Sequence, residues 1–152
     1  MIKTTDLLFG VVSLNGDGTH KFFCDIDDDR LSRDALCFLV NKFGYVCVIK
    51  SGKGFHLANF SVHLSLDELI ELNKLLGADE KYVEWIKKVG YAVLRVSRRS
   101  THFQVPKLIE IIKSKELSVE EIKDIALYKF ILKLESNIDY VYKVIVDDRK
   151  ER

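Results

Sequence analysis

The sequence predicts an α+β domain in which helices pack against a mostly antiparallel sheet. Three observations lead to this fold class. Short apolar runs of strand character are joined by tight glycine turns, which favours antiparallel hairpins. Longer segments with apolar residues at helical spacing alternate with these runs, and such segments pack on a sheet as a second layer. The chain has 152 residues, 47% of them hydrophobic, which is enough for one well-buried domain spanning residues 1–152.

The first expected element is a hairpin that ends in a cluster of carboxylates. Residues 7–14 are an apolar run, residues 15–18 read Asn-Gly-Asp-Gly and signal a tight turn, and residues 21–26 form the returning strand. Alternate side chains of a strand share a face, so Asp25 and Asp27 are expected side by side at its end. Such close carboxylates repel each other unless a cation or a proton lies between them, and their oxygens suit Mg²⁺ or Mn²⁺. The alternative is a solvated acidic turn.

Apolar patterns predict further elements in the middle of the chain. Helical spacing predicts three helices, over residues 30–43, 67–76 and 80–89. Continuous apolar runs predict three strands, over residues 45–49, 55–64 and 91–97. Asp28 or Asp29 is expected to cap the first helix and Ser65 the second, while Gly44 and Gly90 end the helices before them.

The last third of the chain is expected to be helical, with one further strand. Pro106 suits the first turn of a helix that runs to Lys113, and Ser118 with Glu121 forms a capping box for a helix that reaches Leu134. The β-branched residues 140–146 are consistent with a last strand. The apolar positions of these helices are expected to cover the sheet, or to form a partner surface if exposed. They are Leu108, Ile111, Ile112, Ile122, Ile125, Ala126, Phe130 and Ile131.

Composition excludes several classes of protein. The formal net charge is +1, so any nucleic-acid site must be a local basic patch. No apolar run approaches the roughly 20 residues of a membrane span, and the N-terminus has no signal-peptide pattern, so a cytoplasmic protein is expected. Cys24, Cys37 and Cys47 lie in apolar contexts without a paired spacing, which favours reduced core residues over zinc ligands or disulfides.

The second informative stretch is the glycine turn of residues 51–56, Ser-Gly-Lys-Gly-Phe-His. Gly52 and Gly54 allow backbone N–H groups to turn toward an anion and form a phosphate-binding nest. Lys53 adds a positive charge and Ser51 a hydroxyl group, and His56 begins the return strand. The alternative is an ordinary glycine hairpin with an exposed lysine. The turn is not a Walker A loop, because it leads into a strand and not into a helix.

Two further positions carry candidate chemistry. Arg95 and Ser97 share a face of the strand over residues 91–97, and the pair Arg98-Arg99 begins the turn that follows. The planar guanidinium group of arginine suits phosphate oxygens, although surface arginines in a turn are common. Asp79 is the remaining candidate carboxylate, and its alternative role is the N-cap of the helix over residues 80–89.

The order of these motifs resembles that of the archaeo-eukaryotic primase superfamily, the catalytic core of primases and primase-polymerases. Its first motif is similar to residues 23–27, Phe-Cys-Asp-Ile-Asp, and its second to residues 51–56. Its third is similar to Ala78-Asp79, and a basic strand found in many members is similar to Leu94-Arg95. The resemblance covers residues 7–103 and implies an RRM-like primase core there, with residues 104–152 as a helical C-terminal extension of the same domain.

The resemblance also implies roles for the candidate residues. Asp25, Asp27 and Asp79 would be catalytic and would bind Mg²⁺ or Mn²⁺. The nucleoside triphosphate would be held by Ser51, Gly52, Lys53, Gly54, His56 and Arg95. The implied function is a metal-dependent nucleotidyltransferase, a DNA primase or polymerase, that extends single-stranded or primed nucleic acid, with other replication proteins as further partners.

Two other functions remain open at this point. One is a non-catalytic primase-like module that binds nucleotide or single strands within a replication complex. The other is a haloacid-dehalogenase-like phosphatase, because a strand that ends in Asp-x-Asp would supply its nucleophile and acid. Asp29 occupies the position where that second family usually has threonine, which disfavours it. Asp28 and Asp29 have no assigned role, and the sequence leaves open the choice between DNA and RNA.

Overall fold

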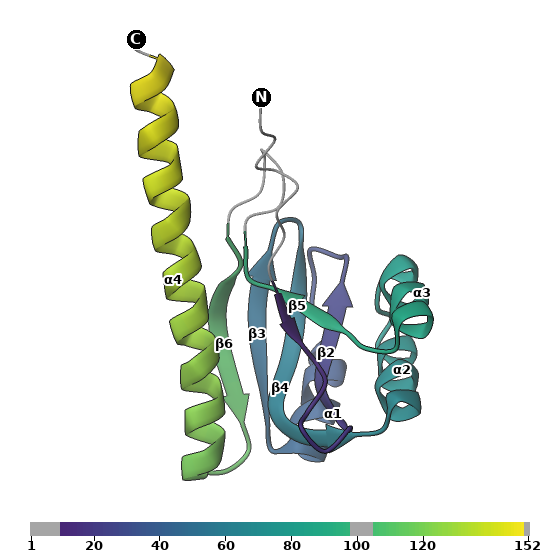
Figure 1. The fold of residues 1–152 in the computed structure, drawn as a ribbon. Coiled ribbons are helices and arrows are strands. Elements are labelled where there is room, and N and C mark those ends of the chain that lie inside the picture. Colours follow the sequence, from purple (N-terminus) through teal and green to yellow (C-terminus); the bar gives the residue numbers. More distant parts are fainter. Residues whose placement is uncertain (1–9, 98–104, 151–152) are drawn as a thin grey trace.

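Two antiparallel sheets and four helices make up the described part of the chain (Figure 1). The computed structural model describes the backbone of residues 10–97 and 105–150, and side chains as far as residue 136. The elements are β1 (Gly10–Val12), β2 (His20–Ile26), α1 (Arg33–Phe43), β3 (Tyr45–Ser51), β4 (Gly54–Leu64), α2 (Leu66–Leu75), α3 (Glu80–Val89), β5 (Val93–Arg95), β6 (Lys107–Lys113) and α4 (Val119–Lys150). The predicted α+β class with antiparallel strands is therefore confirmed.

The main sheet has four strands in the order β2-β4-β3-β6, and each neighbouring pair is antiparallel. β3 and β4 form the predicted hairpin, with Ser51 paired to Gly54 across a two-residue turn. On the other side of β4, Asp25 of β2 is the partner of His56. This register brings the acidic end of β2 beside the glycine turn.

The first predicted hairpin forms only in part. β1 pairs with β5 in a separate two-stranded sheet, and the segment that follows it meets β2 through an isolated bridge between Leu14 and His20. Residues 7–9 of the predicted strand lie outside the described residues. β5 is also shorter than the predicted range 91–97. The prediction of a tight turn at residues 15–18 depends on local residues and is correct. The main partner of β1, however, is β5, which lies about 80 residues away in the chain.

Helices α1, α2 and α3 match the predicted ranges closely, but the cap of α1 was predicted wrongly. The helix begins at Arg33, and the Ser32 hydroxyl accepts a hydrogen bond from the Ala35 amide at 3.2 Å. Asp28 instead accepts from the Arg30 amide at 3.1 Å, which shapes the turn that leaves β2. Gly44 ends α1 with a φ of 88°, a backbone conformation that glycine tolerates best.

Ser65 caps α2 as predicted. Its hydroxyl accepts from the Glu68 amide at 3.1 Å, while the Glu68 carboxylate accepts from the Ser65 amide at the same distance. This reciprocal pair is a capping box. α3 covers the predicted residues 80–89 and ends at Gly90.

The predicted helix over residues 106–113 is wrong, because Lys107–Lys113 is strand β6 at the edge of the main sheet. Pro106 stands directly before the first strand residue, a position that costs no ladder hydrogen bond. A helix of eight residues is marginal by itself, whereas isoleucine-rich residues gain by pairing with the free edge of β3. The C-terminal extension is thus not entirely helical.

The predicted strand over residues 140–146 is also wrong, because these residues lie within α4. The helix starts at the predicted capping box, in which Ser118 and Glu121 bond reciprocally at 2.9 and 3.1 Å. No glycine or proline occurs between residues 119 and 150. Once a cap has nucleated a helix, each added residue costs little, so β-branched residues alone do not end it.

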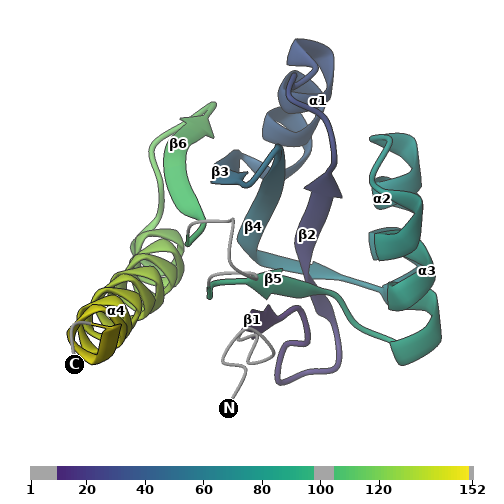
Figure 2. The same ribbon diagram turned by 90° about the horizontal axis from the view of Figure 1, so that it is seen from above.

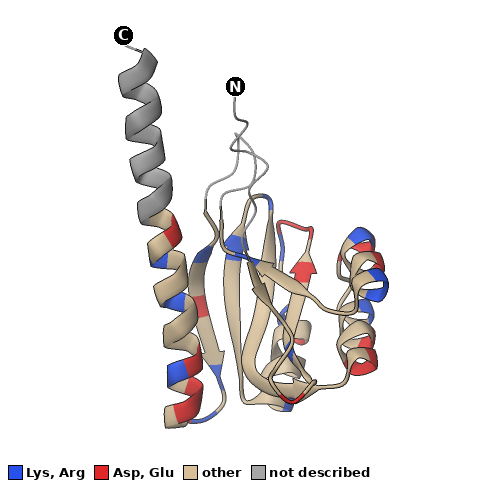
Figure 3. Ribbon diagram, in the orientation of Figure 1, with Lys and Arg blue, Asp and Glu red and all other residues tan. Residues whose placement is uncertain are grey.

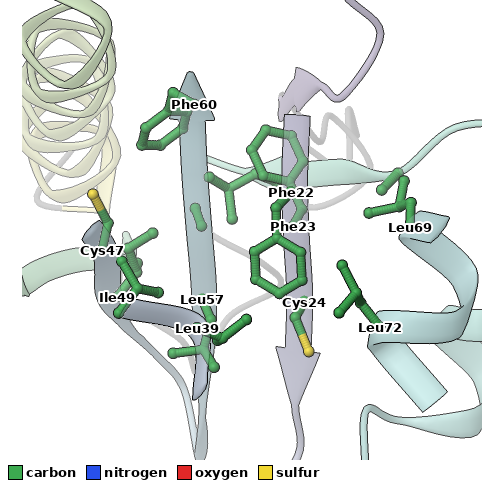
Figure 4. Packing of buried hydrophobic residues seen from close by; sticks show 14 of the residues in the cluster. Phe22, Phe23, Cys24, Leu39, Cys47, Ile49, Leu57, Phe60, Leu69 and Leu72 are labelled. Carbon is green, nitrogen blue, oxygen red and sulfur yellow. The ribbon is translucent and has the colours of Figure 1, made fainter. Parts of the chain in front are cut away.

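The core lies on both faces of the main sheet. Phe22 contacts Phe43 of α1, with ring centroids 5.3 Å apart, whereas its neighbour Phe23 contacts Phe60 of β4 at 5.8 Å. Successive strand residues point to opposite faces, so α1 covers one face. Phe60 stacks on Tyr128 at 4.8 Å, which places α4 on the other face. Figure 2 shows these two helices well apart, and Figure 4 shows residues of α2 beside β2.

Predictions about four apolar residues need correction. Cys24 and Cys47 are buried and free, as expected, but Cys37 is exposed on α1. On α4, Ile125 is buried against the sheet, whereas Ile122, Ala126 and Phe130 are exposed. The helix is therefore apolar on its outward face as well. Among the described helices, none is both long enough and apolar enough to cross a lipid bilayer.

Candidate active site

One small cavity, of about 190 Å³, brings together all nine residues to which the resemblance assigns a catalytic or nucleotide-binding role. Apart from Ile26, its lining consists of those residues. They are Asp25, Asp27, Ser51, Gly52, Lys53, Gly54, His56, Asp79 and Arg95. They come from β2, the β3–β4 turn, the start of α3 and β5. Figure 3 shows the acidic end of β2 close to basic positions of the β3–β4 hairpin and β5.

Asp25 and His56 form a close pair in the lining of this cavity. The two residues are register partners on β2 and β4, and the Nε2 atom of His56 lies 3.4 Å from a carboxylate oxygen of Asp25. The side chains are 12% exposed for His56 and 31% for Asp25, so Asp25 is the more accessible group. The buried Nδ1 atom of His56 has no hydrogen-bond partner among the described residues. This pair is a consequence of strand register.

Asp79 reaches the cavity through a contact between distant parts of the chain. Its amide donates a hydrogen bond to the Asp25 carbonyl oxygen at 2.9 Å, which fixes the start of α3 beside the end of β2. Asp79 is the N-cap residue of α3, yet its side chain makes no capping hydrogen bond. Its carboxylate therefore lines the cavity without the usual capping role. The alternative interpretation of Asp79 as a side-chain cap is not supported.

Gly52 and Gly54 are required in the hairpin for different structural reasons. Gly52 has a φ of 56°, a left-handed conformation that a two-residue hairpin turn requires. A Cβ atom on Gly54 would lie 2.1 Å from the Ile26 carbonyl oxygen, so only glycine lets the turn lie against the end of β2. Between them, Lys53 is exposed and lines the cavity. The hairpin thus supplies a cation to the same cavity wall as the carboxylates.

Arg95 connects the small sheet to the glycine hairpin. Its NH2 group donates to the Ser51 hydroxyl at 2.7 Å, and its NH1 group donates to the Ser97 carbonyl oxygen. With its oxygen accepting this bond, the Ser51 hydroxyl keeps its own proton for another acceptor. Arg95 therefore both orients Ser51 and adds a positive charge to the cavity wall.

Charges of both signs meet in the cavity. Its lining has three carboxylates, Lys53, Arg95 and His56, which suits a ligand that is itself a cation–anion complex. The charge of Asp25 also acts on Tyr82. Burial raises the pKa of the Tyr82 hydroxyl well above its ordinary value, and the thiol of Cys24 and the carboxylate of Asp25 add to this rise.

The donor set fits a hard divalent cation only in part. Carboxylate oxygens are the preferred ligands of Mg²⁺ and Mn²⁺. Among the described residues, however, no group of three or more histidine, cysteine, aspartate or glutamate side chains is placed to enclose a metal ion by itself. Mg²⁺ commonly binds through one or two carboxylates together with phosphate oxygens and water, so Asp25, Asp27 and Asp79 would hold it jointly with a phosphate-bearing ligand.

Lys50 was missed in the sequence, and Asp28 and Asp29 could not be assigned. With Asp27 and Lys53 they line a neighbouring cavity of about 590 Å³. Lys50 lies 4.4 Å above the Phe55 ring. The hydrogen bond from the Arg30 amide lowers the pKa of the Asp28 carboxyl group, with a further contribution from Asp29. The sequence could have indicated Lys50, because this residue directly precedes the motif of residues 51–56 on β3. The predicted arginine pair 98–99 lies outside the described residues.

Comparisons with protein-family models, curated proteins and solved structures give no match for this chain. The motifs and the geometry of the cavity are therefore the features that bear on function.

Proposed function

We propose that this protein is a metal-dependent nucleotidyltransferase of the primase type, which adds nucleotides to a single-stranded or primed nucleic acid. The observation that supports it is the shared cavity. Nine residues from four separate elements were chosen for chemistry of this kind, and all nine line one cavity of about 190 Å³. Unrelated surface residues, such as an acidic turn and an exposed lysine, have no reason to converge in this way.

The roles of the residues follow from their chemistry. Asp25, Asp27 and Asp79 would hold the divalent cation, which supplies charge neutralisation at the reacting phosphate. Lys53 and the Ser51 hydroxyl would bind the β- and γ-phosphates, with Ser51 oriented by Arg95 at 2.7 Å. His56, fixed beside Asp25, would donate a hydrogen bond to a phosphate oxygen.

The reaction is a phosphoryl transfer. The 3′ hydroxyl oxygen of the strand forms a bond to the α-phosphorus, the bond from that phosphorus to the β-bridging oxygen breaks, and pyrophosphate leaves with its electron pair. The hydroxyl proton passes to solvent water. In such reactions the protein mainly positions the groups and stabilises charge, which a preformed cavity with fixed charges does well.

A second candidate function is a non-catalytic module that binds a nucleotide or single strands within a replication complex. One observation favours it: no metal-enclosing group is preformed among the described residues. Against it, the three carboxylates would repel phosphate if no cation accompanied the ligand. The two functions differ in whether strand extension occurs.

The test combines a binding and an activity measurement. Binding of a nucleoside triphosphate is measured with and without Mn²⁺, and extension of a primed single strand is measured in parallel, for the wild type and for Asp25→Asn with Asp27→Asn. The control is Glu116→Gln, which removes one carboxylate whose side chain is 97% exposed. We expect metal-dependent binding, and a loss of extension by about 100-fold or more in the double variant alone.

The other outcomes are equally informative. Metal-dependent binding without extension would favour the binding module. If the wild type binds neither Mn²⁺ nor triphosphate, the cavity is an acidic turn beside a hairpin and the proposal is wrong.

A further inference from the structure

A second and larger cleft, of about 880 Å³, adjoins the small cavity. It lies between α1 and the pair formed by α2 and α3, which Figure 2 shows as two separate helical groups near β2. Ile26, Asp27 and Asp79 line both the cleft and the small cavity. A ligand held by these two carboxylates could therefore extend from one space into the other.

Apolar side chains make up about half of the lining of the cleft. Side chains from the loop before α1, from α1, β4, the end of α2 and α3 face it, and these are Leu31, Ala35, Leu36, Leu57, Leu76 and Val83. Leu57 and Val83 are buried at its base, whereas the other four are half-buried. Half-buried apolar side chains in a concave space stay in contact with water until a ligand covers them. The cleft is thus suited to a ligand with apolar faces.

The charged groups at the rim do not make the cleft a phosphate site. Lys87 lies 3.5 Å from Glu84, and Lys74 lies 3.6 Å from Glu71, so both lysines have carboxylate partners. The rim also carries further carboxylates, Glu80 among them. With Arg30 included, the lining holds three cationic and five anionic side chains, so a polyanion would meet net repulsion there. The chemistry fits a neutral group that has hydrogen-bonding edges and flat apolar faces.

We propose that this cleft binds a nucleoside, a base with its sugar, next to the phosphates in the small cavity. The inference rests on the proposed function. At about 190 Å³ the small cavity is below the roughly 300–1,000 Å³ usual for a small-molecule site, so most of a nucleotide must lie outside it. The neighbouring cavity of about 590 Å³ is lined by five charged residues and by no apolar residue, so it suits a base less well.

Two sources could supply this nucleoside. One is the incoming triphosphate, and the other is the 3′-terminal nucleotide of the strand. Both meet at the reacting phosphate, which lies beside Asp27 and Asp79. The cleft chemistry is the same for either source, and the experiment distinguishes them.

The test fills the cleft without changing the small cavity. Ala35→Trp places a large ring in the cleft, and the matched control Cys37→Trp places the same ring on the same helix at an exposed position outside it. Dissociation constants are measured with Mn²⁺ for tripolyphosphate, for the four common nucleoside triphosphates and for a primed single strand. Far-UV circular dichroism checks that each variant folds. If Ala35→Trp prevents folding, Ala35→Leu is used in its place.

We expect Ala35→Trp to weaken triphosphate binding by about tenfold or more and to leave tripolyphosphate within about twofold, while Cys37→Trp changes neither. This result identifies the incoming nucleotide. If only the primed strand binds more weakly, the cleft holds the terminal nucleoside. If a folded variant binds both as the wild type does, this inference is wrong and the proposed function stands. If the wild type binds no phosphate ligand at all, both are wrong.

Discussion

Gly54 illustrates how one residue can serve packing and chemistry together. The sequence predicts that Gly54 is part of an anion-binding nest, because Gly52 and Gly54 flank Lys53. The structure adds a packing reason, because a Cβ atom there would overlap the Ile26 carbonyl oxygen. That close approach also places Lys53 beside Asp25 and Asp27. Gly54 is therefore needed for the packing of the hairpin against β2, and the geometry of the cavity follows from this packing.

We therefore predict that Gly54→Ala destabilises the protein by about 1–3 kcal/mol, since the backbone of the turn or of β2 must shift to admit the methyl group. The matched control is Gly16→Ala, at a position where an added Cβ atom meets nothing within 4 Å. Its effect should stay within about 0.5 kcal/mol. Urea denaturation followed by circular dichroism measures both. Equal effects of the two substitutions would contradict the packing argument.

At the scale of elements, the ends of helices were easier to predict than the partners of strands. Ser65 and Ser118 cap α2 and α4 through groups three residues apart, so the sequence around them contains all the information. β6 behaves differently. Its residues have no decisive local preference, and their strand state depends on the edge of β3, which lies some 60 residues earlier in the chain. Local patterns cannot specify such a partner.

The cap of α2 gives a prediction at this scale. Ser65→Ala removes the hydroxyl that accepts from the Glu68 amide, and it should lower the free energy of unfolding by about 1 kcal/mol. Ser65→Asn keeps an acceptor at the same position and should cost much less. Chemical denaturation of the three proteins in parallel measures this. If alanine and asparagine are equally destabilising, the hydrogen bond is not what stabilises the helix start.

At the scale of the whole molecule, α4 holds the second face of the sheet in place. Tyr128 stacks on Phe60 at 4.8 Å, and Asp124 accepts from the Ser61 hydroxyl at 2.9 Å. The same hydroxyl lies 2.7 Å from the Tyr45 hydroxyl group, so a chain of polar contacts joins β3, β4 and α4. Among the described residues, the outward face of α4 makes no such contact with the sheet, and the exposed Phe130 lies on this face.

This difference between the two faces of α4 predicts opposite effects of similar substitutions. Tyr128→Ala should destabilise the protein by about 3–5 kcal/mol, because it leaves a cavity over Phe60. Phe130→Ala, at a side chain that is 59% exposed, should change stability by less than about 1 kcal/mol. Thermal and urea unfolding measure both. A large effect of Phe130→Ala would mean that the outward face is buried in solution, for example in an assembly.

The local features of this protein can be predicted from its amino-acid sequence. Periodicity, turn residues and caps predict the α+β class and the turn around Gly52. They also predict that Asp25 and Asp27 lie side by side at the end of a strand. The tertiary structure decided what depends on contacts between distant residues. It set β1 against β5, turned residues 107–113 into a strand, and placed Asp79 and Arg95 beside the end of β2. Side-chain patterns encode local geometry directly, whereas strand partners and cavity walls depend on which surfaces bury each other once the whole chain has folded.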